Sequence, residues 1–201
     1  MAPRISSIAS RLAPDAAAVV DRLRRSTVEI RDAGRGSGCG VIWASDGVIV
    51  TNAHVARSRQ PTVLLSGGRK FEANLLAQDA ERDLAVLRVA ARDLLPITIR
   101  DSSTIRAGEL VLAVGSPWGL SGSAALGIIH GLGWSDGVRG GPWLQASVRL
   151  APGNSGGPLA GADGRLVGLN AMVAGEMGLA IPSNEIERFI SQALRGRREA
   201  A

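Results

Sequence analysis

The stretch CGVIWASDGVIVTN, residues 39–52, contains two short runs of aliphatic and β-branched residues on either side of Ser-Asp-Gly. Valine and isoleucine are enriched in strands, whereas Asp-Gly is typical of tight turns. Runs this short, closed by turn residues, favour strands over helices. We therefore predict that this region folds as two consecutive β-strands.

Similar runs recur along the chain, each short, largely aliphatic and bounded by Gly, Pro, Asp, Asn or Ser. The 26 glycines and nine prolines are spread rather than clustered, which agrees with many strands separated by turns. The sequence therefore predicts an all-β protein built from antiparallel barrels. The further predicted strands are STVEIRD (26–32), TVLLSG (62–67), LAVLRVA (84–90), ELVLAVG (109–115), SAALGIIHGLG (123–133), PWLQASVRL (142–150), GRLVGLNAMVA (164–174) and MGLAIPS (177–183).

Two segments have helical patterns. The first covers about residues 15–25, after a leader at 1–14 that we expect to be flexible. The second covers 183–195, where Ser183 or Asn184 can cap the helix. Residues 196–201 are expected to form a tail. The segment from about 93 to 106 has loop character and would join two halves of the protein. The apolar face of the second helix comprises Ile186, Phe189, Ile190 and Leu194.

Composition argues against several classes of protein. The chain has 201 residues, 45% of them hydrophobic, so it can bury a sizeable core. Its net charge is +5, but the arginines are interspersed with acids, and with no tyrosine and two phenylalanines there is little to stack on bases. We expect no nucleic-acid binding. Cys39 is the single cysteine, which excludes an intrachain disulfide, and we expect it to be a small buried side chain. No apolar run suits a signal peptide or a membrane span, so the chain as given is expected to be cytoplasmic.

The segment LAPGNSGGPLAG, residues 150–161, places a serine among glycines and prolines. Neither a helix nor a central strand would tolerate this composition. A serine hydroxyl becomes a useful nucleophile only beside a base, which in turn needs an orienting acid. Ser155 is therefore a candidate nucleophile, although Gly-Asn-Ser-Gly-Gly alone can also be a flexible loop.

Two histidines could supply the base. His54 directly follows a predicted strand, at a rim where its side chain can be held, whereas His130 lies within a strand with its side chain directed outward. For the acid, Asp83 stands at the start of an apolar strand, while the other aspartates lie mostly in turns and caps. Elimination gives the order His54, Asp83, Ser155. Taken singly, His54 suits an ordinary surface or core histidine and Asp83 a strand-start cap.

The motifs TNAHV (51–55), DLAVL (83–87) and GNSGGPL (153–159) together resemble the chymotrypsin-type serine proteases, in particular their bacterial HtrA branch. The resemblance covers about residues 15–192. It implies two six-stranded antiparallel β-barrels, at about 26–95 and 106–182, with the active site in the cleft between them. It also implies a serine endopeptidase of unfolded or flexible polypeptide that needs no metal or cofactor.

The same resemblance assigns roles to the residues. It implies that His54 is the general base, Asp83 the orienting carboxylate and Ser155 the nucleophile that forms an acyl-enzyme. The loop of Gly153, Asn154 and Ser155 is expected to form the oxyanion hole through backbone N–H groups.

The resemblance also indicates a specificity pocket. Leu150, Val173 and Ala174 are expected to line it, and the substrate backbone to pair with the strand at Met172 to Ala174. Such a pocket would prefer a small or medium aliphatic residue before the scissile bond. Arg149 complicates this expectation, because on the pocket floor it would favour an acidic residue. Strand alternation instead directs Leu150 inward and Arg149 to solvent, and we favour that interpretation.

Two further expectations concern assembly and activity. Relatives of this kind are commonly trimers and commonly carry a PDZ domain, so a homotrimer is implied, while this chain stops just past its second helix. The alternative to a protease is a catalytically silent module that keeps the fold in order to bind peptides or protein partners.

Overall fold

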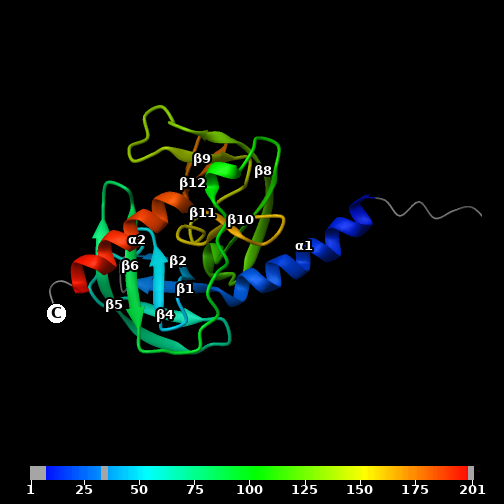
Figure 1. Ribbon diagram of the computed structural model, residues 1–201. Coiled ribbons are helices and arrows are strands. Elements are labelled where there is room, and N and C mark those ends of the chain that lie inside the picture. Colours follow the sequence, from blue (N-terminus) through cyan, green and yellow to red (C-terminus); the bar gives the residue numbers. More distant parts are fainter. Residues whose placement is uncertain (1–7, 33–35, 199–201) are drawn as a thin grey trace, which may run out of the picture.

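The computed structural model describes residues 8–32 and 36–198. Within them the chain forms two closed, antiparallel, six-stranded β-barrels with one helix near each end (Figure 1). This confirms the predicted all-β architecture of two barrels. The strands of the two barrels lie at 27–89 and 110–182, inside the predicted limits of 26–95 and 106–182.

The first barrel has the strand order β1-β2-β3-β6-β5-β4 and closes through the pairing of β1 with β4. Residues 39–52 contribute the second half of β2 and all of β3, which pair as antiparallel neighbours. The six strands are β1 (Thr27–Asp32), β2 (Gly36–Ile42), β3 (Val48–Thr51), β4 (Thr62–Leu65), β5 (Lys70–Asp79) and β6 (Leu84–Val89).

The second barrel has the order β10-β11-β12-β9-β8-β7 and closes through the pairing of β10 with β7. Two strands of the molecule, β5 and β10, are absent from the sequence-based prediction. The six strands are β7 (Leu110–Gly115), β8 (Ser123–Gly133), β9 (Trp143–Ala146), β10 (Pro158–Gly161), β11 (Leu166–Ala174) and β12 (Met177–Pro182).

Strand alternation explains why several strands are apolar at every position. All four residues of β3 are buried. Ile49 packs in the interior of the first barrel, whereas Val48 and Val50 point the other way, into a core shared by both barrels. In β7, likewise, Val111 packs inside the second barrel. Because strands at the barrel junction have two buried faces, their sequences show continuous apolar runs.

Helix α1 (Ile8–Arg25) leads into β1 and is longer than predicted. Residues 8–14 are helical instead of belonging to a flexible leader, and residues 1–7 of that leader lie outside the described part. The helix continues through Pro14, since alanine and leucine on either side favour helix and the proline disturbs only the turn before it. Figure 1 shows the start of α1 projecting from the body, whereas Leu23, near its end, is buried in the shared core.

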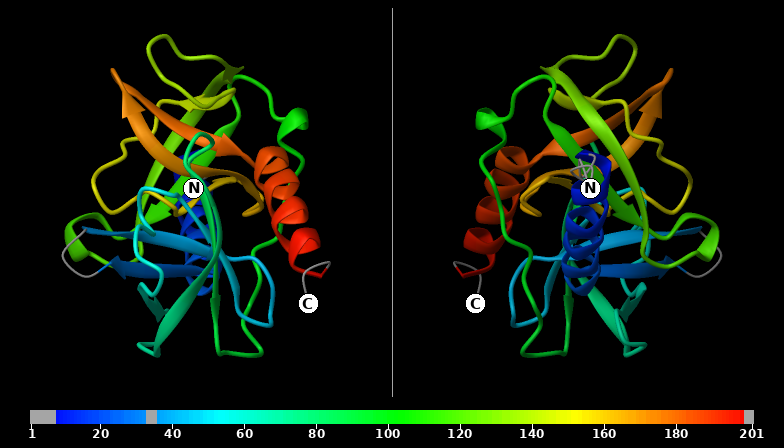
Figure 2. Two further views of the ribbon diagram at one scale, coloured as in Figure 1. Left: turned by 90° about the vertical axis from the view of Figure 1, so that its left-hand side faces the viewer. Right: turned by 90° about the vertical axis from the view of Figure 1, so that its right-hand side faces the viewer.

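Helix α2 (Ser183–Arg198) runs past the predicted end at residue 195, so residues 196–198 of the expected tail are helical and 199–201 lie outside the described residues. Its predicted apolar residues Ile186, Phe189 and Ile190 are buried in the core shared by the two barrels. In Figure 2 the helix lies along one side of the molecule. It therefore covers the junction of the barrels.

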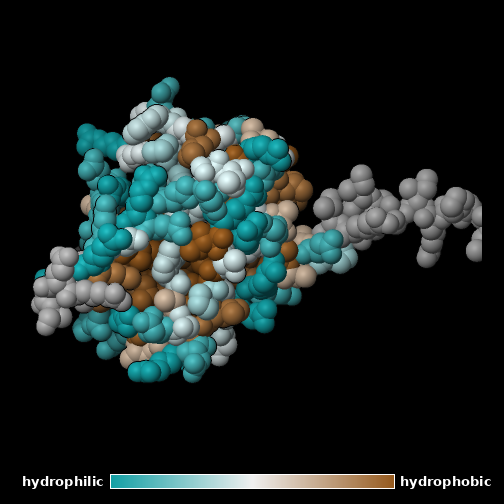
Figure 3. All heavy atoms as spheres, in the orientation of Figure 1, coloured by the Kyte–Doolittle hydropathy of each residue, from teal (hydrophilic) through white to brown (hydrophobic). Residues whose placement is uncertain are grey.

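The connection between the barrels contains a short 3-10 helix, η1 (Ser102–Thr104), as expected of a loop-like segment. A second such turn, η2 (Pro117–Gly119), follows β7. On the face shown in Figure 3, hydrophobic residues gather towards the middle and hydrophilic residues predominate around them. Neither described helix is apolar and long enough to cross a membrane.

Candidate active site

His54 lies on a single turn directly after β3. The N–H groups of Val55 and Ala56 both donate to Asn52 O, at 3.1 and 3.3 Å, and close that turn. The apolar strand and the turn together hold the His54 side chain at the rim of the first barrel, where 39% of it is exposed. This is the placement predicted from the sequence.

Asp83 lies directly before β6, the strand that pairs with β3, so the two strand ends meet. Its carboxylate makes two hydrogen bonds to His54, one from ring Nδ1 (2.8 Å) and one from the backbone N–H (3.0 Å). A carboxylate only accepts, so Nδ1 carries the proton and Nε2 is left as the acceptor. The Asn52 side chain donates to Asp83 O at 3.1 Å and ties the two loops together.

Ser155 lies on the loop between β9 and β10. Its neighbours Gly153 and Gly156 have φ of 103° and 80°, in the region that favours glycine. A Cβ on Gly153 would overlap Ser116 O, and one on Gly156 would overlap Cys39 O. The loop thus requires glycine on both sides of the serine.

Cys39 of β2 supports this loop from the first barrel. Its N–H donates to Ser155 O at 2.7 Å and its thiol donates to Gly153 O at 3.3 Å. The side chain is fully buried, as expected, and burial raises the pKa of the thiol to about 11. The thiol is therefore neutral at physiological pH and able to donate.

The segment at η2 supports the loop from the other side. Ser116 N–H donates to Gly153 O (3.1 Å) and Trp118 N–H donates to Pro152 O (3.3 Å). Carbonyl and N–H point in opposite directions across a trans peptide, so the N–H of Gly153 points away from Trp118.

The loop expected to form the oxyanion hole, Gly153 to Ser155, contains three backbone N–H groups in different environments. Asn154 N–H donates to Ala151 O at 2.9 Å and closes a turn, so it is not available to an oxyanion. Within the described part of the chain, the N–H groups of Gly153 and Ser155 donate to no other group. Of the residues expected to form the oxyanion hole, Gly153 and Ser155 thus have an unengaged backbone N–H, whereas Asn154 does not.

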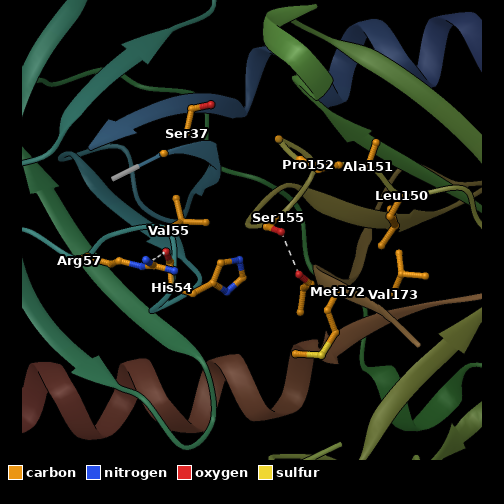
Figure 4. A pocket seen from close by; sticks show the side chains of 13 residues that line it. Ser37, His54, Val55, Arg57, Leu150, Ala151, Pro152, Ser155, Met172 and Val173 are labelled. Carbon is orange, nitrogen blue, oxygen red and sulfur yellow. Dashed lines mark hydrogen bonds between the residues drawn. The ribbon is translucent and has the colours of Figure 1, made fainter. Parts of the chain in front are cut away.

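His54 and Ser155 border the same cavity, of about 460 Å³, at the junction of the barrels. Figure 4 shows their side chains next to each other in the middle of this cavity. The Ser155 hydroxyl donates to Ala171 O at 2.9 Å. The structure thus brings together the three side chains selected from the sequence, with the serine hydroxyl turned towards β11.

Most of the predicted specificity residues border this cavity. Leu150, Met172 and Val173 line one end of it, whereas Ala174 does not. Beyond Ala171, β11 pairs only with β12, because β10 pairs with residues 166–169, so this part of β11 has an open edge. Arg149 is exposed and lies outside the lining, although β9 ends at Ala146 and residues 147–150 are not part of the strand predicted there.

His130, the rejected candidate base, is exposed on β8. Across residues 8–32 and 36–198 no cluster of three or more His, Cys, Asp or Glu side chains could hold a metal ion.

Sequence reasoning overlooked the residues that hold the site in place. Asn52 joins the His54 and Asp83 loops, and Ser116 and Trp118 hold the Gly153 loop through backbone N–H groups. Asn52 stands inside the TNAHV motif and could have been noticed there. The contributions of Ser116 and Trp118 are independent of side-chain type, so their residue types gave no signal. Arg57 also lines the cavity.

Comparison with known proteins yields one matching family and several related serine proteases. Residues 36–169 match the family described as trypsin-like peptidase domain. The chain is 36% identical over 199 residues to serine protease HTRA4 of Homo sapiens, covering 88% of this chain and 41% of that protein. It is 40% identical over 158 residues to the probable periplasmic serine endoprotease DegP-like of Halomonas elongata, covering 74% of this chain and 33% of that protein. The chain thus spans less than half the length of either relative.

Solved structures agree with the sequence relatives. The HtrA-type protease AlgW with a tripeptide superposes with a TM-score of 0.84 at 32% identity, covering 90% of this chain and 64% of that one. The HtrA-type protease AlgWS227A with a tripeptide superposes with a TM-score of 0.83 at 31% identity, covering 87% of this chain and 62% of that one.

Proposed function

Because this chain belongs to the trypsin-like peptidase family and is similar to HtrA-type proteases over most of its length, we propose that it is a serine endopeptidase acting through Ser155, His54 and Asp83. One observation carries the proposal. His54 is held by two hydrogen bonds to Asp83 in the cavity that also contains Ser155, which lies beside two unengaged backbone amides.

The first half of the reaction forms an acyl-enzyme. The Ser155 hydroxyl rotates from Ala171 O to His54 Nε2, which takes its proton as Oγ bonds to the substrate carbonyl carbon. The carbonyl oxygen becomes an oxyanion bound by the N–H groups of Gly153 and Ser155, where each donor contributes about 3 to 4 kcal/mol in the transition state. Protonated His54 then gives its proton to the leaving amine as the peptide C–N bond breaks.

The second half releases the product. Water attacks the acyl carbon, His54 takes a proton from it, and the Ser155 Oγ–C bond breaks as the serine recovers its proton. Asp83 stays ionised throughout, holds the imidazole in the Nδ1–H tautomer and stabilises the imidazolium.

The substrate is an unfolded or flexible polypeptide with a small or medium aliphatic residue before the scissile bond. Leu150, Met172 and Val173 form an apolar end of the cavity for that side chain. An extended substrate adds a strand to the open edge of β11, which a folded segment could not do. The AlgW structures with a tripeptide support a peptide ligand for this fold.

Labelling with a fluorophosphonate tests the proposal. The probe reacts only with an activated serine, so we expect one label per chain in the wild type and none in Ser155→Ala, measured by intact mass. Ser147→Ala is the matched control, because Ser147 is exposed and outside the cavity, and it should label fully. Labelling that survives Ser155→Ala contradicts the assignment of the nucleophile. An unlabelled wild type that still binds unfolded polypeptide would support a silent binding module instead.

A further inference from the structure

The cavity has two chemically different ends, with His54 and Ser155 between them. Leu150, Met172 and Val173 lie at one end, and Figure 4 shows Ser37, Val55 and Arg57 on the opposite side of His54. The first end is apolar and next to the open edge of β11. The second end, built entirely by the first barrel, carries a guanidinium group.

The direction of the substrate follows from this arrangement, given the proposed protease function. The residues before the scissile bond occupy the apolar end and the edge of β11, and the scissile carbonyl lies beside Ser155 and Gly153. The chain must leave by the end that remains, past Val55 and Arg57. Arg57 is thus placed beside the residues that follow the scissile bond.

Hydrogen bonds hold Arg57 in place. Its backbone N–H donates to the buried carboxylate of Asp32 (2.8 Å), and its Nε donates to His54 O (2.9 Å). Among the described residues its side chain donates only through Nε, to His54 O, and both Nη groups remain available. A guanidinium held at one nitrogen loses less entropy on binding and can give its remaining donors to a substrate carboxylate.

The charge of the cavity lining also favours an acidic substrate residue. Among the described residues that line the cavity there is no Asp, Glu or Lys and no second Arg, so no acidic group there competes with a substrate for Arg57. Arg59, two positions along, is exposed but does not line the cavity. Arg57 and Arg59 carry the same charge, but only Arg57 is placed to contact a substrate in the cavity.

We propose that Arg57 is a specificity-determining residue that selects substrates with Asp or Glu at the first or second position after the scissile bond. This inference rests on the proposed protease function and adds to it a preference on the leaving side of the bond.

Matched internally quenched peptides test it. Two sets keep one aliphatic residue before the bond and place Glu, Gln or Lys at the first or the second position after it. In one set or both, kcat/KM of the wild type should be about two- to fivefold higher for Glu than for Gln, as for a partly exposed ion pair, and lowest for Lys. The preference should weaken at about 0.5 M salt, where charges are screened within a few ångströms.

For each variant, the quantity measured is the ratio of kcat/KM for the Glu peptide to kcat/KM for the Gln peptide, rather than the absolute rate. Arg57→Gln should bring the ratio to about one, Arg57→Glu should reverse it, and Arg57→Lys should retain part of it. Arg59→Gln removes the same charge outside the cavity and should keep the wild-type ratio.

Two results would overturn the inference and leave the protease standing: equal kcat/KM for Glu and Gln peptides at both positions in an enzyme that cleaves them, or a preference that persists in Arg57→Gln. Absence of both cleavage and fluorophosphonate labelling would instead remove the proposed function, and this inference with it.

Discussion

At the scale of single residues, the most informative contact is that of Asp83 with His54. One carboxylate oxygen accepts the backbone N–H of His54 and the other accepts ring Nδ1–H, so the ring is fixed in both position and tautomer. Asp83 does so from a left-handed backbone, φ 55°, which aspartate and asparagine tolerate better than most residues. Asparagine can therefore replace it with little strain.

Asp83→Asn should lower kcat on the order of 10⁴-fold while the protein stays folded. The asparagine oxygen would keep the bond from His54 N–H and turn its NH₂ group to Nδ1, which forces the imidazole proton onto Nε2, the nitrogen that must accept from Ser155. Peptide hydrolysis and circular dichroism measure the two effects. Asp93→Asn is the matched control, since Asp93 is also left-handed (φ 56°) but exposed, and it should keep wild-type kcat. Activity within tenfold of wild type in Asp83→Asn would refute the role of Asp83.

At the scale of elements, the inter-barrel connection and α2 hold each other. Ser183 Oγ donates to Arg100 O (2.6 Å), and Asn184 Nδ2 donates to Asp101 Oδ1 (2.7 Å). Asn184 Oδ1 accepts Ser102 N–H at 3.1 Å. Hydrogen bonds from Ser103 and Asn184 lower the pKa of Asp101. The first turn of α2 thus fixes the connection where it passes from one barrel to the other.

Asn184→Ala removes the side-chain bonds to Asp101 Oδ1 and Ser102 N–H at once, while the backbone N–H of residue 184 keeps its bond to Ser102 Oγ. We expect it to reduce the free energy of unfolding by about 1 to 2 kcal/mol, the range found for lost side-chain caps. Urea unfolding followed by tryptophan fluorescence measures this change. Glu187→Ala, on the exposed face of the same helix, should unfold at the wild-type midpoint. Equal midpoints for Asn184→Ala and wild type would show that the Asn184 side chain does not stabilise this junction.

At the scale of the whole molecule, the site exists only because two barrels share a core. Val48 and Val50 of the first barrel pack there with Leu112 and Val114 of the second. Cys39 sits at this junction, bonded through its thiol to Gly153 of the other barrel. Burial raises the pKa of this thiol from 9.0 to about 11, so its protonated state is linked to the stability of the molecule.

The free energy of unfolding should fall as pH rises from about 9 to 11. In this window the unfolded thiol has lost its proton and the folded thiol keeps it, so the folded state binds more protons and alkali favours unfolding, by about 1.4 kcal/mol per pH unit at most. The chain has no tyrosine to add to the effect. Urea unfolding midpoints between pH 7 and 11 measure this decline. Cys39→Ala should make the midpoint nearly independent of pH in this range, whatever its value at pH 7. An equally steep decline in that variant would exclude Cys39 as the source.

The two strands missed in the sequence show what local pattern can and cannot do. In β5, KFEANLLAQD, Ala73 is buried and most other residues are partly or fully exposed, so the polar and apolar residues do not separate into a clear strand pattern. The four-residue β10 is bounded by proline and glycine and resembles a turn. β5 is a strand because it pairs with β4 and β6, which flank it in the sequence, and β10 pairs with the following β11 and with the distant β7.

The sequence by itself determined the all-β class, the helices, and His54, Asp83 and Ser155 as candidates, because these follow from alternation, capping and residue chemistry within short windows. The tertiary structure alone decided which loop amides stay unengaged, that Cys39 and the η2 segment hold the Gly153 loop, and that Arg57 faces the cavity. Those features depend on contacts between residues far apart in the sequence, some between the two barrels and some within the second. The hydrogen bond from Cys39 to Gly153, for example, joins residues 114 positions apart, and no local pattern encodes such a contact.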